Sequence, residues 1–256
     1  MPKLQRPIVS FATSKGGAGK STLAIAFAGE LAAEGGRVAI LDTDPQQSVL
    51  KWSKKPNKPD QIDVFEATDE EIMIDLIHSC QKTHHVIVID VQGRVSEIGN
   101  TAMAWSDLVV IPLQGAGMDA DGAVSTVKNV RKVEKARSAE IAYATVINRV
   151  SGAIRSRTAE AVRDLFSENN IPMLGTVVDR EAFRVMTTSG GTQHTLTRAD
   201  APGLEKARGD TASLTRAIAE KIGLIRKGQG TSASRTDDGA IAQTIAQAGN
   251  ALQAAQ

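Results

Sequence analysis

Aromatic side chains and cysteine are scarce in this chain. Only 3% of its 256 residues are aromatic, and it has one cysteine. A single cysteine excludes a disulfide framework within the chain, a cysteine-ligated zinc site and an iron–sulfur cluster held by one chain. Hydrophobic residues still make up 41% of the sequence, so the core has to be built from Val, Ile, Leu and Ala.

The chain also lacks an excess of charge of one sign and a long apolar run. Thirty Lys and Arg residues balance 29 Asp and Glu residues, for a net charge of +1. Contact with nucleic acid would therefore have to come from a local basic patch. No stretch approaches the roughly 18 apolar residues that span a bilayer, and no apolar signal region precedes the first strand. These absences predict a soluble protein of the cytoplasm with no membrane partner.

Short, continuously apolar segments alternate with helical segments. Strands are predicted at residues 8–12, 37–41, 86–89, 108–111, 141–147 and 175–178. Helices are predicted at residues 21–34, 70–80, 123–136, 158–166 and 204–222. Strands without polar alternation are typical of a parallel sheet covered by helices. We therefore expect an α/β fold with a doubly wound, mainly parallel sheet and helices on both faces.

The composition changes near residue 227. Residues 227–239 are rich in Gly, Ser and Thr, as in a linker, and residues 240–256 are mostly Ala, Gln, Ile and Leu. We expect one folded domain over residues 1–226, followed by a flexible linker and tail over residues 227–256. The tail is either frayed or a docking helix for a partner. It lacks the basic residues of an amphipathic membrane anchor.

Residues 14–22, Ser-Lys-Gly-Gly-Ala-Gly-Lys-Ser-Thr, stand between a predicted strand and a predicted helix. That is the context of a phosphate-binding loop. Glycines let backbone N–H groups turn toward phosphate oxygens, and the following helix terminus favours the same anion. Lys20 can reach the β- and γ-phosphates, and the Ser21 hydroxyl can bind Mg²⁺. The nucleotide-binding residues predicted here are Lys15, Gly16, Gly17, Ala18, Gly19, Lys20, Ser21 and Thr22. Ser14 replaces the first glycine of the ordinary pattern.

Acidic residues follow two of the predicted strands. Val86-Ile87-Val88-Ile89 followed by Asp90 is a Walker B pattern, in which Asp90 binds Mg²⁺ directly or through water. Asp42 and Asp44 stand two residues apart after the strand at 37–41. Such a pair occurs in phosphate-transfer sites, and it also occurs in ordinary turns and helix caps.

The segment Lys-Gly-Gly-Ala-Gly-Lys-Ser resembles the deviant Walker A motif of the ParA/MinD ATPases. In that family the extra lysine, here Lys15, crosses a dimer interface to the partner's nucleotide. Residues 42–48 resemble the family's D-x-D-P-Q segment. The resemblance implies that Asp44 orients the attacking water, with Lys15 and Lys20 as the other catalytic residues, and that Asp42 lies near the Mg²⁺ shell. ATP and Mg²⁺ are the implied ligands.

The resemblance spans about residues 7–225, and it extends to the base pocket. Asn148 matches the position where the family places an Asn side chain on adenine, with a strand-end turn as the alternative. Residues 179–184 resemble the family's loop near the base, which puts Asp179 at the nucleotide. The family often has proline just after the Walker B aspartate, whereas this chain has Val91-Gln92-Gly93.

Within the family, the chain is most similar to the short ParA proteins. The tail lacks the basic membrane helix of MinD, and no helix-turn-helix domain precedes the first strand. The resemblance implies an ATP-dependent homodimer, non-specific binding to double-stranded DNA and a centromere-binding ParB-like partner that stimulates slow hydrolysis. Its output would be partition of a plasmid or chromosome region on the nucleoid. Local charge predicts DNA contacts at Arg184, Arg216, Lys221, Arg226 and Lys227, with a solvated charged face as the alternative.

Three other hypotheses stay open. Residues 153–158 and 182–184 also resemble the partition-like ATPase of T-DNA transfer systems, so the cargo could be a DNA-transfer complex or a protein cluster. A metabolic P-loop enzyme would need a pocket for its own small-molecule substrate. A binding module with a dead ATP site is disfavoured by the intact Lys20, Ser21, Asp44 and Asp90.

Several residues are given structural interpretations. The lysines at positions 51, 54, 55 and 58 are accompanied by Pro56 and Pro59, and this run is predicted to be a solvated loop. Cys80 is predicted to fill space in the core from a helix. His84 and His85 lack further ligands at useful spacing, which disfavours a metal site.

Overall fold

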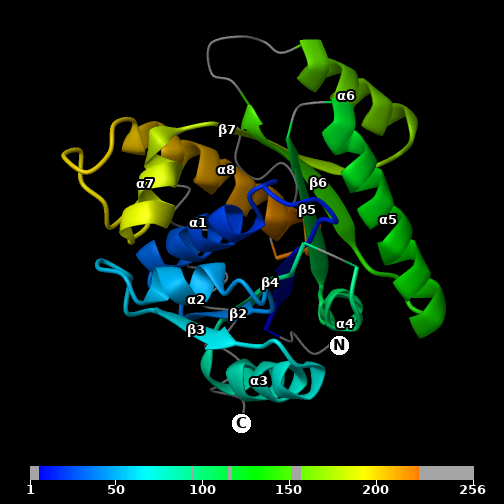
Figure 1. The fold of residues 1–256 in the computed structure, drawn as a ribbon, viewed down its shortest axis with the longest axis horizontal. Helices are drawn as coiled ribbons and strands as arrows, with labels where there is room; N and C mark the ends of the chain where they lie inside the picture. Colours follow the sequence, from blue (N-terminus) through cyan, green and yellow to red (C-terminus); the bar gives the residue numbers. More distant parts are fainter. Residues whose placement is uncertain (1–5, 94, 115–116, 151–156, 225–256) are drawn as a thin grey trace.

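A computed structural model describes residues 6–93, 95–114, 117–150 and 157–224 (Figure 1). Its strands are β1 (Ile8–Phe11), β2 (Val38–Asp42), β3 (Ile62–Glu66), β4 (Val86–Asp90), β5 (Leu108–Gln114), β6 (Tyr143–Val150) and β7 (Met173–Val178). They form one parallel sheet in the order β3-β2-β4-β1-β5-β6-β7. The predicted doubly wound α/β fold is confirmed.

Helices cover both faces of the sheet (Figure 1). They are α1 (Lys20–Ala33), α2 (Ser48–Ser53), α3 (Glu70–Thr83), α4 (Glu97–Trp105), α5 (Gly117–Arg137), α6 (Arg157–Glu168), α7 (Glu181–Ser189) and α8 (Leu204–Lys221). One apolar cluster joins the sheet to α1, α2, α7 and α8, and a second joins it to α3, α4, α5 and α6. Cys80 is buried in the second cluster, as predicted.

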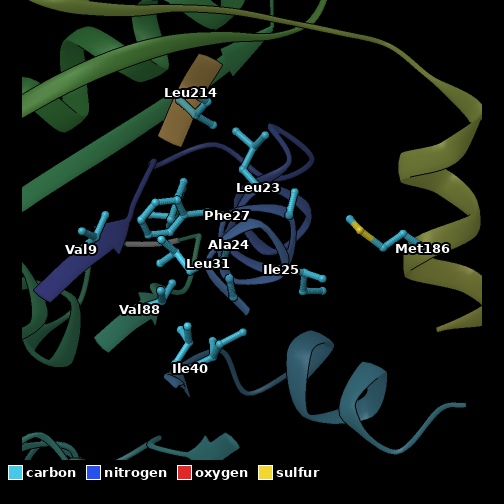
Figure 2. Packing of buried hydrophobic residues seen from close by; sticks show 14 of the residues in the cluster. Val9, Leu23, Ala24, Ile25, Phe27, Leu31, Ile40, Val88, Met186 and Leu214 are labelled. Carbon is cyan, nitrogen blue, oxygen red and sulfur yellow. The ribbon is translucent and has the colours of Figure 1, made fainter. Parts of the chain in front are cut away.

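Each central strand supplies residues to both clusters because successive side chains point to opposite faces. In β1, Val9 faces the first cluster and Ile8 the second. Figure 2 shows the first cluster, where Phe27 and Leu31 of α1 lie beside Val9 and Val88 of the sheet. Continuous apolar strands are therefore required here, since neither face of the sheet is left to water.

The polar residues at the carboxyl ends of the strands are brought to one edge of the sheet. Asp42 is paired in register with Asp90, and Gln114 with Asn148. After β1 the chain continues to β2, which lies on one side of β1 in the sheet. The later strand β5 pairs with β1 on its other side. Open parallel sheets bind ligands at such a switch point, outside the carboxyl ends of the strands.

The sequence interpretation missed β3, α2, α4 and α7, and its loop prediction for the lysine run holds only after Ser53, where α2 ends. Lys51 lies in α2 rather than in a loop. The ammonium groups of Lys55 and Lys58 donate hydrogen bonds to the carbonyl oxygens of Thr187 and Ile62, at 2.8 and 2.6 Å. These lysines therefore tie chain segments together. No helix among the described residues is long and apolar enough to cross a membrane, and the predicted linker and tail lie outside those residues.

Candidate nucleotide-binding site

The glycine-rich loop is shaped by its left-handed glycines. Gly17 and Gly19 have φ values of 81° and 91°, and Gly19 caps the start of α1 without a side-chain hydrogen bond from any described residue. The first N–H groups of a helix lack partners within the helix, so those of α1 are available to an anion. The loop lines one wall of a cavity of about 470 Å³.

Lys20 is one of the residues that line this cavity. Lys20 is buried, with 7% of its surface exposed. A Cβ atom built on Gly93 would stand 3.3 Å from the Lys20 ammonium nitrogen, so the segment after β4 passes directly over the lysine. Gly93 and Asp44 line the same cavity. The predicted catalytic residues Lys20 and Asp44 are therefore brought together.

Ser21 and Asp90 form a pair beside the loop. The Ser21 hydroxyl donates a hydrogen bond of 2.6 Å to one carboxylate oxygen of Asp90. The other oxygen is buried and has no hydrogen-bond partner among the described residues. Burial raises the pKa of Asp90 to about 7, because an ionised carboxylate is costly away from water.

This pair fits a magnesium ion. A buried carboxylate oxygen without a donor, next to a hydroxyl, is a hard oxygen set of the kind Mg²⁺ prefers. No cluster of three or more His, Cys, Asp or Glu residues capable of holding a metal occurs in the part of the chain that the structure describes. Since Mg²⁺ keeps several waters and binds phosphates readily, Ser21 and Asp90 would hold it together with nucleotide oxygens.

Asp42 and Asp44 have different surroundings. Asp42 is fully buried, and its carboxylate accepts hydrogen bonds from the backbone N–H groups of Asp44, Val49 and Leu50 at 3.2, 2.9 and 2.9 Å. Burial raises the pKa of Asp42. Asp44 accepts a 2.8 Å bond from the Gln46 N–H and lines the cavity. Asp42 thus builds the start of α2, and its predicted place near the Mg²⁺ shell stays a prediction.

Two side chains from distant parts of the sequence support the loop through hydrogen bonds. The side-chain amides of Gln114 and Asn148 donate 2.9 Å hydrogen bonds to the carbonyl oxygens of Gly17 and Ala18. Asn148 is 4% exposed, and its amide nitrogen lies 2.1 Å from where a Cβ on Gly19 would stand. In this structure Asn148 therefore supports the phosphate loop, and its contact with a base stays a prediction.

A narrow cleft adjoins the loop at the predicted base pocket. Its walls combine predicted and unpredicted residues: Thr22, Asn148, Arg149, Val178, Asp179, Phe183, Arg184 and Thr187. Of residues 179–184, interpreted as a loop, only Asp179 and Arg180 lie in one, because β7 ends at Val178 and α7 begins at Glu181. The cleft holds about 40 Å³, room for about one water molecule, so a base would have to widen it.

Two helices missed by the sequence interpretation complete the larger cavity. Lys51 and Trp52 of α2, Lys55 just after α2 and Thr187 of α7 line it. The Trp52 indole N–H donates a 2.9 Å bond to the carbonyl oxygen of Gly191, and this bond joins α2 to the segment after α7. These contacts link residues more than 130 positions apart, so no local spacing could have indicated them.

Arg184, a predicted DNA contact, is engaged with acidic neighbours. Its guanidinium donates to the carboxylates of Asp179 and Glu181 at the start of α7. Both ion pairs are partly exposed and therefore weak. The two carboxylates offset the positive charge of the Arg184 guanidinium.

The other predicted DNA contacts do not gather around Arg184. Lys221 lines a cavity at the amino ends of β5 and β6, beside Asp107 and Tyr143, whereas Arg184 lines the cleft at the carboxyl ends. Arg216 lies in α8. Arg226 and Lys227 lie outside the described residues. The structure therefore separates Arg184 from Lys221 rather than joining them in one patch.

Seven parallel strands with a glycine-rich loop, a buried lysine and a Walker B aspartate at the switch point define a P-loop nucleotide-binding protein. Comparison with known proteins narrows this class. The profile of the VirC1 protein family matches residues 6–225. Protein ParA of Rhizobium radiobacter is 31% identical over 191 residues, covering 74% of this chain and 86% of that protein. Protein virC1 of Rhizobium rhizogenes is 27% identical over 189 residues, covering 72% and 81%. The chain belongs to the VirC1/ParA family of deviant Walker A ATPases.

Solved structures confirm the fold. The apo McdA protein of Cyanothece superposes with a TM-score of 0.66 at 15% identity, covering 83% of this chain and 99% of that one. A plasmid partition protein of Borrelia burgdorferi, solved with AMPPNP, gives a TM-score of 0.65 at 18% identity, covering 84% and 99%.

Proposed function

We propose that the chain is a Mg²⁺-dependent ATPase that works as an ATP-dependent dimerisation switch. One observation carries the proposal: the two lysines of the loop have different surroundings. Lys20 lines the cavity of its own chain, whereas Lys15 is not among the lining residues and lies against Gly122 of α5. This arrangement supports a role for Lys15 at a nucleotide held by a second copy, which its likeness to the family's extra lysine implies.

The chain's own groups have separable tasks in this reaction. The loop N–H groups and Lys20 bind the phosphates, and Ser21 with Asp90 holds the metal. Mg²⁺, when bound, neutralises charge that develops on the transferred phosphoryl group. Asp44 orients the attacking water. Lys15 from the partner adds positive charge at the same oxygens, where electrostatic stabilisation counts most. Asn148 and Asp179 border the base, and hydrolysis weakens the dimer because γ-phosphate contacts are lost.

The output we propose is partition of a plasmid or chromosome region in the cytoplasm, on the nucleoid. The ATP-bound dimer would bind double-stranded DNA non-specifically, since pairing two chains doubles every basic patch. A centromere-binding ParB-like protein would stimulate hydrolysis. The relative named ParA and the plasmid partition protein of similar fold support this assignment.

A second candidate keeps the switch and changes the cargo to a DNA-transfer complex. The match to the VirC1 profile over residues 6–225 favours it. The two candidates share their chemistry and differ in the protein that stimulates hydrolysis.

The test measures retention on non-specific duplex DNA at low salt, with ATP–Mg²⁺ against ADP–Mg²⁺, for the wild type and Lys15→Ala. Sedimentation under the same conditions reports the dimer. We expect dimers and DNA retention with ATP only, both lost in Lys15→Ala. ATP-dependent dimers without DNA retention would move the cargo to a protein. A monomer in every nucleotide state, or hydrolysis that responds to a metabolite instead, would overturn the switch.

A further inference from the structure

The backbone of α5 comes unusually close to Lys15. A Cβ atom built on Gly122 would stand 3.2 Å from the Cβ of Lys15 and 3.7 Å from its Cδ. The first distance is shorter than ordinary van der Waals contact between carbon atoms. A side chain at position 122 would therefore press on Lys15, which would have to shift by a few tenths of an ångström.

Hydrogen bonds fix the same approach. The Ser14 N–H donates to the Thr126 hydroxyl oxygen at 3.0 Å, and the Ser14 hydroxyl donates to the Gly122 carbonyl at 3.1 Å. The Thr126 hydroxyl donates to that carbonyl at 2.8 Å. Three groups thus close a ring between α5 and the residue preceding Lys15. Ser14, which replaces the first glycine of the ordinary motif, supplies two of its donors.

We propose that Gly122 and Thr126 of α5 are positioning residues for Lys15, which set the path by which that lysine reaches the partner's nucleotide. The inference rests on the proposed dimerisation switch and extends it to residues outside the loop. Gly122 leaves room for the side chain, and Thr126 anchors the backbone through Ser14. The loop that binds the chain's own phosphates does not depend on this ring, because Gln114 and Asn148 hold it separately.

A second glycine within a helix provides a matched control. Gly209 of α8 has no atom within 4 Å of a built Cβ. Alanine favours helix over glycine at either position, so neither Gly122→Ala nor Gly209→Ala should lower the unfolding temperature through helix propensity. A difference between them in dimerisation then reports the contact with Lys15.

The experiment measures dimerisation by sedimentation equilibrium with Mg²⁺–AMPPNP, and nucleotide affinity with fluorescent ADP. We expect Gly122→Ala to weaken the dimer several-fold and Gly122→Val to weaken it by about ten-fold or more, since the larger side chain overpacks the contact and displaces Lys15 further. Both variants should bind ADP within about two-fold of wild type, and Gly209→Ala should match wild type in both measurements.

A double-mutant cycle separates positioning from general damage. If Gly122 acts through Lys15, Gly122→Ala should have no further effect on dimerisation in the Lys15→Ala background. Thr126→Val should weaken the dimer, and Thr126→Ser, which keeps the hydroxyl, should restore it. Equal effects of Gly122→Ala with and without Lys15 would overturn the inference, as would a Gly122→Val protein that dimerises like wild type.

These outcomes are distinct from failure of the proposed function. If wild type forms no dimer with AMPPNP, the switch itself is wrong, and the inference falls with it. If wild type dimerises and Lys15→Ala does not, while the Gly122 and Thr126 variants behave as wild type, only the positioning role of α5 is wrong.

Discussion

The hydroxyl of Ser21 lies 2.6 Å from one oxygen of the Asp90 carboxylate, while the other oxygen is buried without a hydrogen-bond donor from any described residue. An uncompensated buried carboxylate destabilises a folded protein. Such a cost to stability is common at functional sites, and it supports the proposed use of the pair in binding Mg²⁺.

Replacing Asp90 should separate activity from stability. In Asp90→Asn the metal site loses its charge, so we expect ATP hydrolysis to fall by about 100-fold or more. The unfolding midpoint in urea should be no lower than that of wild type, because a buried charge is removed. Asp107→Asn is the control: Asp107 is also a carboxyl whose pKa burial raises, but it accepts a bond from Ile8 at the other edge of the sheet. It should keep hydrolysis. Retained activity in Asp90→Asn would contradict the metal assignment.

Gly19→Ala should be far more damaging than an ordinary left-handed glycine substitution. Gly35 has a φ of 83° and open space around a built Cβ, so Gly35→Ala should cost only the backbone penalty of about 1 kcal/mol. Gly19 adds the collision with Asn148, 2.1 Å away, which should cost about 1–3 kcal/mol more. Chemical denaturation measures both. Equal losses would show that Asn148 moves aside freely.

Acid should weaken the fold through His84. This residue is 3% exposed, and its Nε2 lies 2.9 Å from Asp63. Burial lowers the pKa of His84, despite the opposing effects of the Asp63 carboxylate and the Cys80 carbonyl and with the help of the nearby Arg37 charge. The unfolded chain therefore takes up the proton first as the pH falls below about 6.5, and stability drops by up to about 1.4 kcal/mol per pH unit.

His84→Gln tests this linkage. The variant should be less stable than wild type at pH 8, because it loses the bond to Asp63, and its stability should fall less steeply between pH 7 and pH 5.5. Substitution of the exposed His78 by Gln serves as the control and should keep the wild-type slope. An unchanged slope in His84→Gln would assign the acid sensitivity to other groups.

Lys55→Met should weaken the contact between α7 and the segment that follows α2, and so lower the stability of the fold. The Lys55 ammonium donates 2.8 Å bonds to the carbonyls of Thr187 and Thr188 in the last turn of α7. A cation at a helix carboxyl terminus satisfies orphan carbonyls and the helix dipole, so its loss should cost about 1 kcal/mol of unfolding free energy. The neighbouring Lys54 is exposed, and Lys54→Met should leave the urea midpoint within experimental error. Equal midpoints for the two variants would remove Lys55 from this role.

The sequence predicted the central strands and the phosphate loop because both are local patterns. Continuous apolar runs indicate strands buried on both faces, and β1, β2, β4, β5 and β6 have that character. β3 was missed because it is an edge strand: Ile62 is its one fully buried residue, and Asp63 and Glu66 interrupt the run. α2 has only six residues, too few for a helical period to show.

The supports of the site could not be predicted for a different reason. Asn148 was assigned to a base by resemblance, whereas its amide in the structure holds the carbonyl of Ala18. Thr126 and Gly122 belong to a helix whose sequence carries no motif. Such contacts depend on which strands become neighbours, and sequence spacing does not contain that information.

The phosphate loop is held by hydrogen bonds to residues that are synthesised much later than the loop itself. Gln114, Thr126 and Asn148 follow their loop partners by 97, 112 and 130 positions. During synthesis the glycine-rich segment emerges early, but its supporting side chains are not all present until β6 has been added to the sheet. A fragment that ends before β6 would contain the whole glycine-rich sequence and yet lack the Asn148 hydrogen bond that supports its shape.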